Sequence, residues 1–245
     1  MKNAKRTLLT AHSGCDGTPD NSIAFLRYAA GIGVDSLEVD VRLDSHGTLV
    51  LAHDTESAGP PTLQQAFGII RDVPGLLLNC DLKTRGLEQE IWRMAKEERV
   101  ADRLIYSGDV SAAAMADNPA MADAVRWYFN LEIRFPRIYT DPSAGLGACS
   151  AAYVALELGK TMRKVHADCL NLNWKLWSTA LWDALRRAQI PLSVWTPDSE
   201  AHLRFFLGQG VANITTRQTE RALELRRRLD ETGSLVPVMP LEVAG

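Results

Sequence analysis

The sequence predicts a closed (β/α)8 barrel, the TIM-barrel architecture, formed by a single domain over residues 1–245. Apolar runs of strand length alternate with segments of helical periodicity along the chain, which favours a parallel sheet with helical crossovers. About eight such strand–helix units fit into the 245 residues. Because no fixed-period repeat, low-complexity block or linker interrupts the pattern, we expect one domain.

The alternative architecture is an open, doubly wound sheet. A glycine-rich phosphate loop would favour it, and the sequence contains neither GxGxxG nor GxxxxGK[ST]. The closed barrel is therefore the preferred prediction.

Hydrophobic periodicity and turn signals assign the individual elements. The turn signal Asp44-Ser45-His46-Gly47 joins two extended segments, so the second of them is expected to be an accessory hairpin arm. The stretch 133–147 is rich in Pro, Gly and Asp and is expected to be irregular, and the tail after Gly233 loosely ordered. The expected strands are 7–11, 36–41, 48–52, 76–83, 103–107, 126–131, 169–173, 191–196 and 213–215; the expected helices are 21–32, 62–70, 87–98, 111–121, 149–165, 178–188, 200–208 and 218–229.

Composition excludes several classes of protein. A hydrophobic content of 46% is too high for a disordered chain, and a net charge of −3 gives no basic footprint for nucleic acid. No apolar run approaches the roughly 18 residues that span a bilayer, and the amino terminus lacks the apolar core of a secretory signal. The four cysteines are widely spaced and form no CxxC pair. We expect a cytoplasmic protein with reduced thiols.

Acidic side chains interrupt two of the expected barrel strands. Side chains alternate across a strand, so Glu38 and Asp40 share one face of 36–41, and Asp81 and Lys83 share one face of 76–83. Since helices cover the outside of a barrel, these faces are expected to point inward. Buried carboxylates repel one another, and a divalent cation would compensate them; oxygen ligands suit Mg²⁺ or Ca²⁺ better than zinc. The alternative is an internal salt-bridge network of the same residues with Lys83.

Two histidines lie at strand ends. His12 closes the first expected strand and His53 closes the hairpin arm. Because catalytic groups converge at the carboxyl ends of barrel strands, these two histidines are candidate catalytic residues. Of the other three, His46 lies in the hairpin turn and is expected to be solvated. His166 and His202 fall near expected helices without an acidic or histidine partner at ligand spacing, and none of the three is expected to be functional.

Together these segments resemble the glycerophosphodiester phosphodiesterase family. The resemblance runs through most of the chain, and each short motif is weak alone, whereas the ordered set is specific. The matching segments are Ala11-His12-Ser13-Gly14 (HRG), Pro19-Asp20-Asn21-Ser22 (PEN[ST]), 33–41 (G-x-D-x-x-E-x-D-V), 47–54 (the DG-x-x-V-x-x-HD hairpin), 79–83 (E-x-K, with Asp81 for glutamate), Trp195-Thr196-Pro197-Asp198 (WT-x-N) and 210–216 (GVD-x-x-x-TD).

The resemblance implies a TIM-barrel phosphoric diester hydrolase that acts on a small-molecule phosphodiester with one divalent cation, Mg²⁺ or Ca²⁺. Position by position, the catalytic pair falls on His12 and His53, the metal ligands on Glu38, Asp40 and Asp81, the phosphate-side lysine on Lys83, and the aromatic residue at the alcohol end of the pocket on Trp195.

Departures from the family pattern qualify this expectation. Ser13 stands where the family has an arginine that clamps phosphate, and serine cannot reproduce the planar guanidinium fork. Lys83 and the cation would then carry more of the anion stabilisation. Only residues 55–61 separate His53-Asp54 from the next helix, so the usual cap insertion is very short and the mouth should be open. Thr216 and Gln218 replace the usual Asp and Pro.

Three other functions are considered beside the metal-dependent phosphodiesterase. A catalytically silent relative that binds a phosphorylated ligand is supported by Ser13 alone. A phosphodiester lyase like the phospholipase D toxins shares the missing cap, but the expected secretion signal and disulfides are not found. An amidohydrolase would need an H-x-H pair, which Ala11-His12-Ser13 lacks. The alcohol, the choice of cation, the acid and base roles of the two histidines and the oligomeric state stay open.

Overall fold

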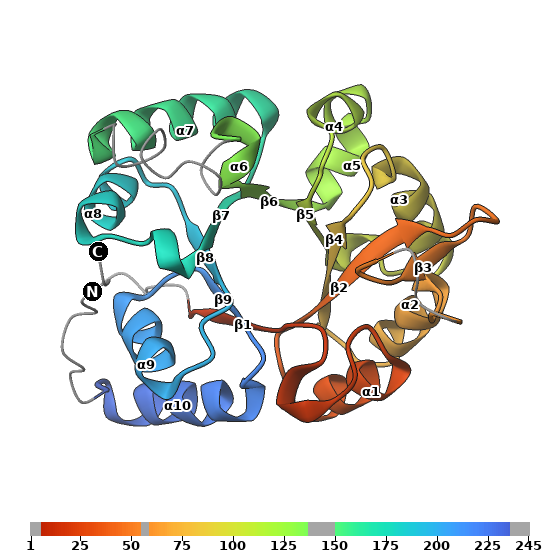
Figure 1. The fold of residues 1–245 in the computed structure, drawn as a ribbon, viewed down its shortest axis with the longest axis horizontal. Coiled ribbons are helices and arrows are strands. Elements are labelled where there is room, and N and C mark those ends of the chain that lie inside the picture. The colour runs from red at the N-terminus through yellow and green to blue at the C-terminus, as the bar shows by residue number, and fades with distance from the viewer. Residues whose placement is uncertain (1–5, 55–58, 137–149, 236–245) are drawn as a thin grey trace.

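The computed structural model describes residues 6–54, 59–136 and 150–235 and shows a ring of parallel strands surrounded by helices (Figure 1). The ring closes because β1 pairs with both the second and the last of the barrel strands. The predicted (β/α)8 barrel is confirmed. In ring order the strands are β1 (Leu8–Ala11), β2 (Ser36–Leu43), β4 (Leu77–Leu82), β5 (Leu104–Gly108), β6 (Arg126–Asn130), β7 (Cys169–Asn173), β8 (Leu192–Trp195) and β9 (Asn213–Thr216).

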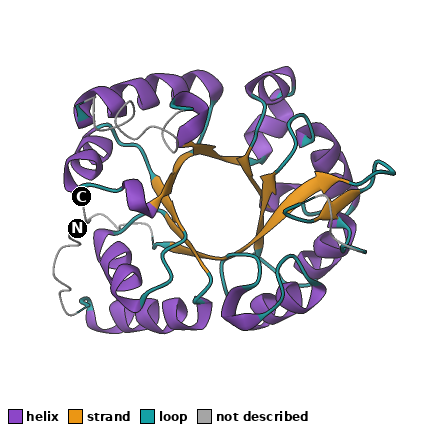
Figure 2. Ribbon diagram, viewed as in Figure 1, coloured by secondary structure: helices purple, strands orange, loops and turns teal. Residues whose placement is uncertain are grey.

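The hairpin arm lies outside this ring, as expected. Strand β3 (Leu49–Leu51) pairs antiparallel with β2 and extends from the barrel (Figure 2). Its turn is stabilised by Asp44, whose Oδ1 accepts hydrogen bonds from the backbone N–H groups of His46 and Thr48, both at 2.8 Å. The arm returns to the barrel where the Ala52 N–H donates to the Asp40 carbonyl at 3.0 Å. This contact brings His53 to the carboxyl end of β2.

Helices connect the strands and cover the outside of the ring. Several begin at side-chain caps; Thr62 and Gln65, for example, form a reciprocal capping box. The helices are α1 (Ile23–Gly31), α2 (Leu63–Arg71), α3 (Glu88–Glu97), α4 (Ala112–Asp117), α5 (Pro119–Ala124), α6 (Leu131–Arg134), α7 (Ala151–Val165), α8 (Thr179–Arg187), α9 (Glu200–Gln209) and α10 (Thr219–Thr232).

Two element assignments differ from the prediction. The expected helix over 111–121 is divided into α4 and α5, because Pro119 starts a new helix that the Asn118 side chain caps. The expected strand over 126–131 ends at Asn130, where α6 begins. The irregular stretch 133–147 and the tail after Gly233 lie mostly outside the described residues, as does part of the short cap at 55–61.

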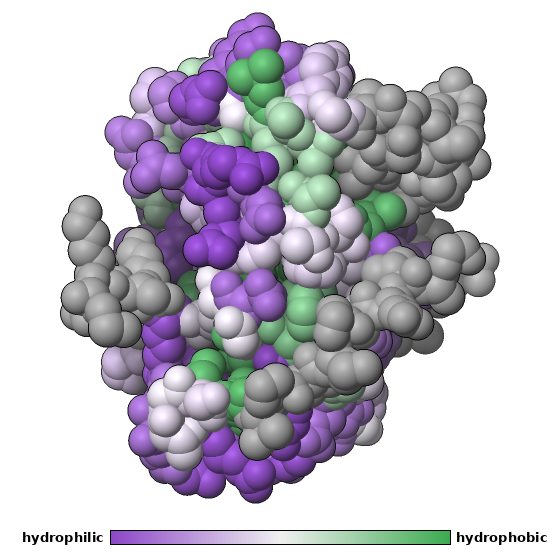
Figure 3. Space-filling model, turned by 90° about the vertical axis from the view of Figure 1, so that its left-hand side faces the viewer, coloured by the Kyte–Doolittle hydropathy of each residue, from purple (hydrophilic) through white to green (hydrophobic). Residues whose placement is uncertain are grey.

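The apolar core lies between the strands and the helices. Leu37, Val39 and Val41, on the outward face of β2, are fully buried there. The face in Figure 3 mixes hydrophilic and apolar residues, and hydrophilic residues gather along its foot, where α10 lies. None of the helices in the described ranges combines the length and the apolarity needed to cross a membrane.

Candidate active site

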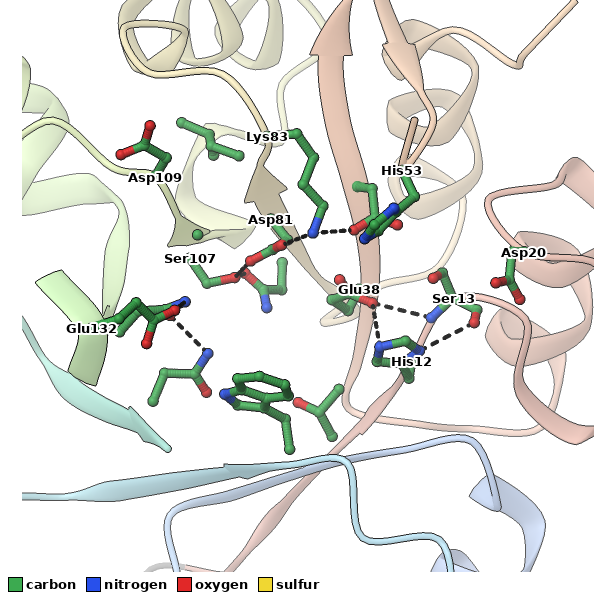
Figure 4. Close-up of a pocket in the computed structure, with 18 of the residues that line it drawn as sticks. His12, Ser13, Asp20, Glu38, His53, Asp81, Lys83, Ser107, Asp109 and Glu132 are labelled. Atoms are coloured by element: carbon green, nitrogen blue, oxygen red, sulfur yellow. Dashed lines mark hydrogen bonds and ion pairs between the residues drawn. The ribbon is translucent and has the colours of Figure 1, made fainter. Parts of the chain in front are cut away.

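A cavity of about 850 Å³ opens at the carboxyl ends of the strands. All eight residues predicted from the sequence line it (Figure 4). They come from β1, β2, the hairpin arm, β4 and β8, which the closure of the ring brings to one end of the barrel. These residues are His12, Ser13, Glu38, Asp40, His53, Asp81, Lys83 and Trp195.

Three carboxylates form a cluster on the cavity wall. Asp40 and Asp81 are directly paired neighbours in the register of β2 and β4, and Glu38 precedes Asp40 by one strand repeat. One oxygen from each of the three lies within 4.8 Å of the others. Glu38 and Asp40 are buried, with 6% and 5% of their surface exposed. The alternation of the strand therefore produces the predicted inward-facing acidic face.

Lys83 neutralises only part of this charge. Its Nζ lies 2.8 Å from Asp40 Oδ1 and 2.5 Å from Asp81 Oδ2. Burial alone would lower the pKa of Lys83. The charges of Asp81 and Asp40 outweigh this effect, so the pKa of Lys83 lies above its ordinary value. Part of the alternative salt-bridge network is thus present. One ammonium against three carboxylates still leaves two negative charges within the cluster.

Neutral donors complete the surroundings of the acids. Asn21 Nδ2 donates to Asp40 Oδ2 at 2.7 Å, the Ser13 N–H donates to Glu38 Oε2 at 3.1 Å, and the Ser107 hydroxyl donates to Asp81 Oδ1 at 2.7 Å. These bonds fix the carboxylates in place without adding positive charge. Burial, followed by the neighbouring Asp40 and Asp81, raises the pKa of Glu38 well above its usual range.

This donor set fits a hard divalent cation. It is made of oxygen atoms alone, which Mg²⁺ and Ca²⁺ prefer, and its residual charge equals that of one dication. Glu38, Asp40 and Asp81 are the residues that would hold such an ion.

His12 lies beside the acids in a defined orientation. Its Nδ1 is 3.2 Å from the Ser13 carbonyl, and since a carbonyl only accepts, Nδ1 carries the ring proton of the neutral form. Nε2, which lies 4.0 Å from Glu38 Oε2, then bears the lone pair. Burial and, second, the charge of Arg217 lower the pKa of His12. A neutral His12 with this tautomer is suited to accept a proton in the cavity.

His53 has a different environment at the cavity mouth. Its side chain is 68% exposed, and Nδ1 lies 3.0 Å from Oδ1 of Asp54. His53 is therefore exposed beside a carboxylate, whereas His12 is largely buried.

The cavity also contains polar residues that the sequence analysis did not single out. Asn171 Nδ2 donates to Asn130 Oδ1 at 3.0 Å, and Asn130 Nδ2 donates to Glu132 Oε1 at 2.9 Å. Asn130 ends β6, so the strand-end rule that identified His12 could have found it, whereas Asn171 lies in the middle of β7. Asp20 and Arg217 also line the cavity. Asp20 lies in the segment between β1 and α1, whereas Arg217 directly follows β9, two residues beyond the expected strand 213–215.

Comparisons with known proteins agree with this architecture. No protein-family model matches the chain. A glycerophosphodiester phosphodiesterase of Caldanaerobacter subterraneus subsp. tengcongensis is 28% identical, and the similarity covers 91% of this chain and 99% of that protein.

Solved structures share the fold. One is a glycerophosphodiester phosphodiesterase from Parabacteroides distasonis, with a TM-score of 0.69, 18% identity, and 92% and 98% of the two chains covered. Another is an Oleispira antarctica phosphodiesterase in complex with the product sn-glycerol-3-phosphate, with a TM-score of 0.66, 19% identity, and 90% and 96% covered. The resemblance of this chain to the glycerophosphodiester phosphodiesterases, expected from its motifs, is confirmed in sequence and in fold along nearly its whole length.

Proposed function

We propose that this chain, acting as one domain over residues 1–245, is a metal-dependent phosphodiesterase that hydrolyses a glycerophosphodiester-like substrate. The observation that carries the proposal is the undercompensated cluster of Glu38, Asp40 and Asp81 in one cavity with two histidines in different environments. The relation to a curated glycerophosphodiester phosphodiesterase supports the same activity.

The residues of the cavity divide into charge-holding and proton-moving groups. A dication held by the three carboxylates would stabilise the negative charge that develops on the phosphate oxygens during displacement. Lys83 keeps Asp40 and Asp81 in position and adds positive charge on the same side. Trp195 and Ser13 line the remaining wall and are assigned to substrate binding.

We assign His12 as the general base and His53 as the general acid. In a glycerol ester the neighbouring hydroxyl attacks phosphorus and gives its proton to Nε2 of His12. The bond from phosphorus to the departing alcohol breaks, and His53 protonates that oxygen. The cyclic phosphate formed is then opened by water with the two proton transfers reversed. If the two roles are exchanged, the effect of leaving-group basicity on the two histidine variants is exchanged as well. His12→Ala and His53→Ala therefore test both assignments.

The direct test is turnover of an aryl ester of glycerol 3-phosphate, which carries the neighbouring hydroxyl, by the purified chain, with Mg²⁺, with Ca²⁺ and with a chelator. This compound is the aryl phosphodiester used in the tests below. We expect turnover with a cation, and its loss on chelation and recovery on adding the cation back. A panel of glycerophosphodiesters with different alcohols then identifies the natural class of substrate. No turnover with either cation would support the silent phospho-ligand-binding relative. Accumulation of a cyclic phosphate that is never opened, followed by phosphorus NMR, would identify a lyase instead.

A further inference from the structure

The cavity contains more than one candidate for binding the anionic phosphate. Among the described residues that line it, the permanent cations are Lys83, Arg85 and Arg217. Lys83 is already held between Asp40 and Asp81. Ser13, at the residue after His12, has no charge. A phosphodiester that approaches His12 therefore needs a cationic partner from another part of the chain.

Arg217 reaches this place from the last strand of the barrel. Strand β9 pairs with β1, Thr216 lies opposite Ala11, and the His12 N–H donates to the Thr216 carbonyl at 3.0 Å. The residue that follows β9 is consequently a spatial neighbour of the residues that follow β1. Arg217 Nη1 donates to the Gly14 carbonyl at 3.4 Å, one residue beyond Ser13.

Asp20 holds the guanidinium in a defined position. Arg217 Nη1 donates to Asp20 Oδ1 at 2.7 Å, and Nη2 donates to Oδ2 at 3.0 Å, which is the bidentate geometry of a fixed arginine. A guanidinium has more N–H donors than one carboxylate engages, so Arg217 retains donors for a second anion. Both side chains line the cavity.

The backbone at Gly14 is fitted closely to this ion pair. Gly14 has φ of +74°, and a Cβ at this position would lie 1.9 Å from Asp20 Oδ1 and 3.0 Å from Arg217 Nη1. A side chain at position 14 would therefore collide with the Asp20–Arg217 ion pair. Glycine allows this ion pair to contact the backbone next to His12 and Ser13. The influence of the Arg217 charge on His12 agrees with this proximity.

We propose that Arg217 binds the phosphate group of the substrate, and that it thereby supplies from the end of β9 the guanidinium that position 13 lacks. Asp20 is the positioning residue for Arg217. This inference rests on the proposed phosphodiesterase function, because it names a phosphate-binding residue of that same cavity.

Arg85 provides a matched control. It too lines the cavity and pairs with an exposed aspartate, but its Nε and Nη2 both donate to the single oxygen Asp109 Oδ1, at 3.0 Å and 2.6 Å. Asp109 and Asp20 lie on opposite sides of the acidic cluster in Figure 4, so the two arginine pairs flank it. Only Arg217 contacts the segment that carries His12 and Ser13.

The test compares Arg217→Gln with Arg85→Gln in the full chain. Inorganic phosphate is the probe, titrated by calorimetry with saturating Mg²⁺ and again with Ca²⁺, and kcat and KM are measured for the aryl phosphodiester. We expect R217Q to weaken phosphate binding and to lower kcat/KM by roughly 10- to 100-fold, the range for a lost charge-assisted hydrogen bond. R85Q should lose less phosphate affinity and less kcat/KM than R217Q, because Arg85 does not contact the segment that carries His12 and Ser13. A loss in R85Q as large as in R217Q would contradict the proposal. Phosphate affinity in R217Q equal to wild type would overturn the proposal, even if its melting temperature falls.

A conservative variant covers the case in which R217Q does not fold. Arg217→Lys keeps the charge and loses the fork, so we expect a smaller loss of phosphate affinity, about three- to tenfold. A folded R217K with unchanged affinity contradicts the proposal. Failure of the wild-type chain to turn over any diester would instead remove the proposed function, while the phosphate titration still decides whether Arg217 binds the anion.

Discussion

Asp35 and Glu38 are three residues apart in the sequence but lie at opposite ends of the barrel, and the charge of their carboxylates is compensated differently at the two ends. At the amino end, Asp35 forms an ion pair with Arg226 of α10, and its Oδ2 also accepts from the Leu9 N–H at 2.7 Å. Arg226 in turn donates to the Thr7 carbonyl at 3.1 Å. One acid meets one base, and the charge is balanced within the fold.

At the carboxyl end the balance is missing. Asp40 and Asp81 share Lys83, whereas Glu38, among the described residues, accepts from the Ser13 N–H and lies 4.0 Å from the His12 ring. Buried charge without compensation is costly, and a bound cation would complete the balance. The comparison separates a carboxylate that is paired within the fold from the carboxylates that, under the proposed function, would hold a cation.

Exchanging one carboxylate for an amide at the cavity should give the largest effect on activity. Glu38→Gln removes a ligand and part of the charge that holds the cation, and we expect kcat/KM on the aryl diester to fall about 10³-fold or more. Steady-state kinetics at several cation concentrations measures this. Activity within tenfold of wild type would exclude Glu38 as a ligand.

The histidine variants should follow, with losses of roughly 10²- to 10³-fold for His12→Ala and His53→Ala on a diester with a poor leaving group. A good leaving group needs little protonation, so it should restore much of the activity of H53A and little of H12A. The measurement is kcat/KM across aryl diesters of graded leaving-group pKa. If a good leaving group restored the activity of H12A alone, the acid and base roles would have to be exchanged. Equal and complete loss of activity in both variants would refute distinct roles.

The same chemical change at the amino end should affect stability instead. Asp35→Asn leaves the buried Arg226 without its partner, and we expect the free energy of unfolding to fall by about 3 kcal/mol, while the folded fraction keeps its activity. Urea denaturation together with kinetics on the folded protein checks this. Loss of activity without loss of stability in D35N would remove the distinction between the two ends.

The smallest effect concerns pH. Glu38 has a raised pKa in the folded chain, so without a cation the folded state binds more protons than the unfolded state above the ordinary value of 4.5. The free energy of unfolding should therefore fall as pH rises from 4.5 through the folded pKa. The free energy of unfolding of the wild type and of E38Q is measured in chelator at several pH values. The difference between the two slopes is the contribution of Glu38. A saturating cation should abolish it, and a slope identical in E38Q would assign it to another group.

Local patterns predicted the barrel and much of the cavity because they report on local geometry. The alternation of Glu38 and Asp40 with apolar residues requires an inward acidic face, and closure of the ring brings Asp81 beside them. The stretch 111–121 is divided into two helices because Asn118 caps the second one. Hydrophobic periodicity does not distinguish one continuous helix from two successive ones. The contact of Arg217 with Gly14 could not be predicted from local sequence, because it depends on the pairing of β9 with β1, which are at opposite ends of the chain.

Calorimetric titration of the chelator-treated chain with Mg²⁺ and with Ca²⁺ measures whether the acidic cluster holds a cation. We expect one dication to bind per chain and to raise the melting temperature, and we expect binding to be lost in the Glu38→Gln/Asp40→Asn double variant but kept in Asp35→Asn. Wild-type protein that binds neither ion, or a double variant that binds one as tightly as wild type, would refute the cation site.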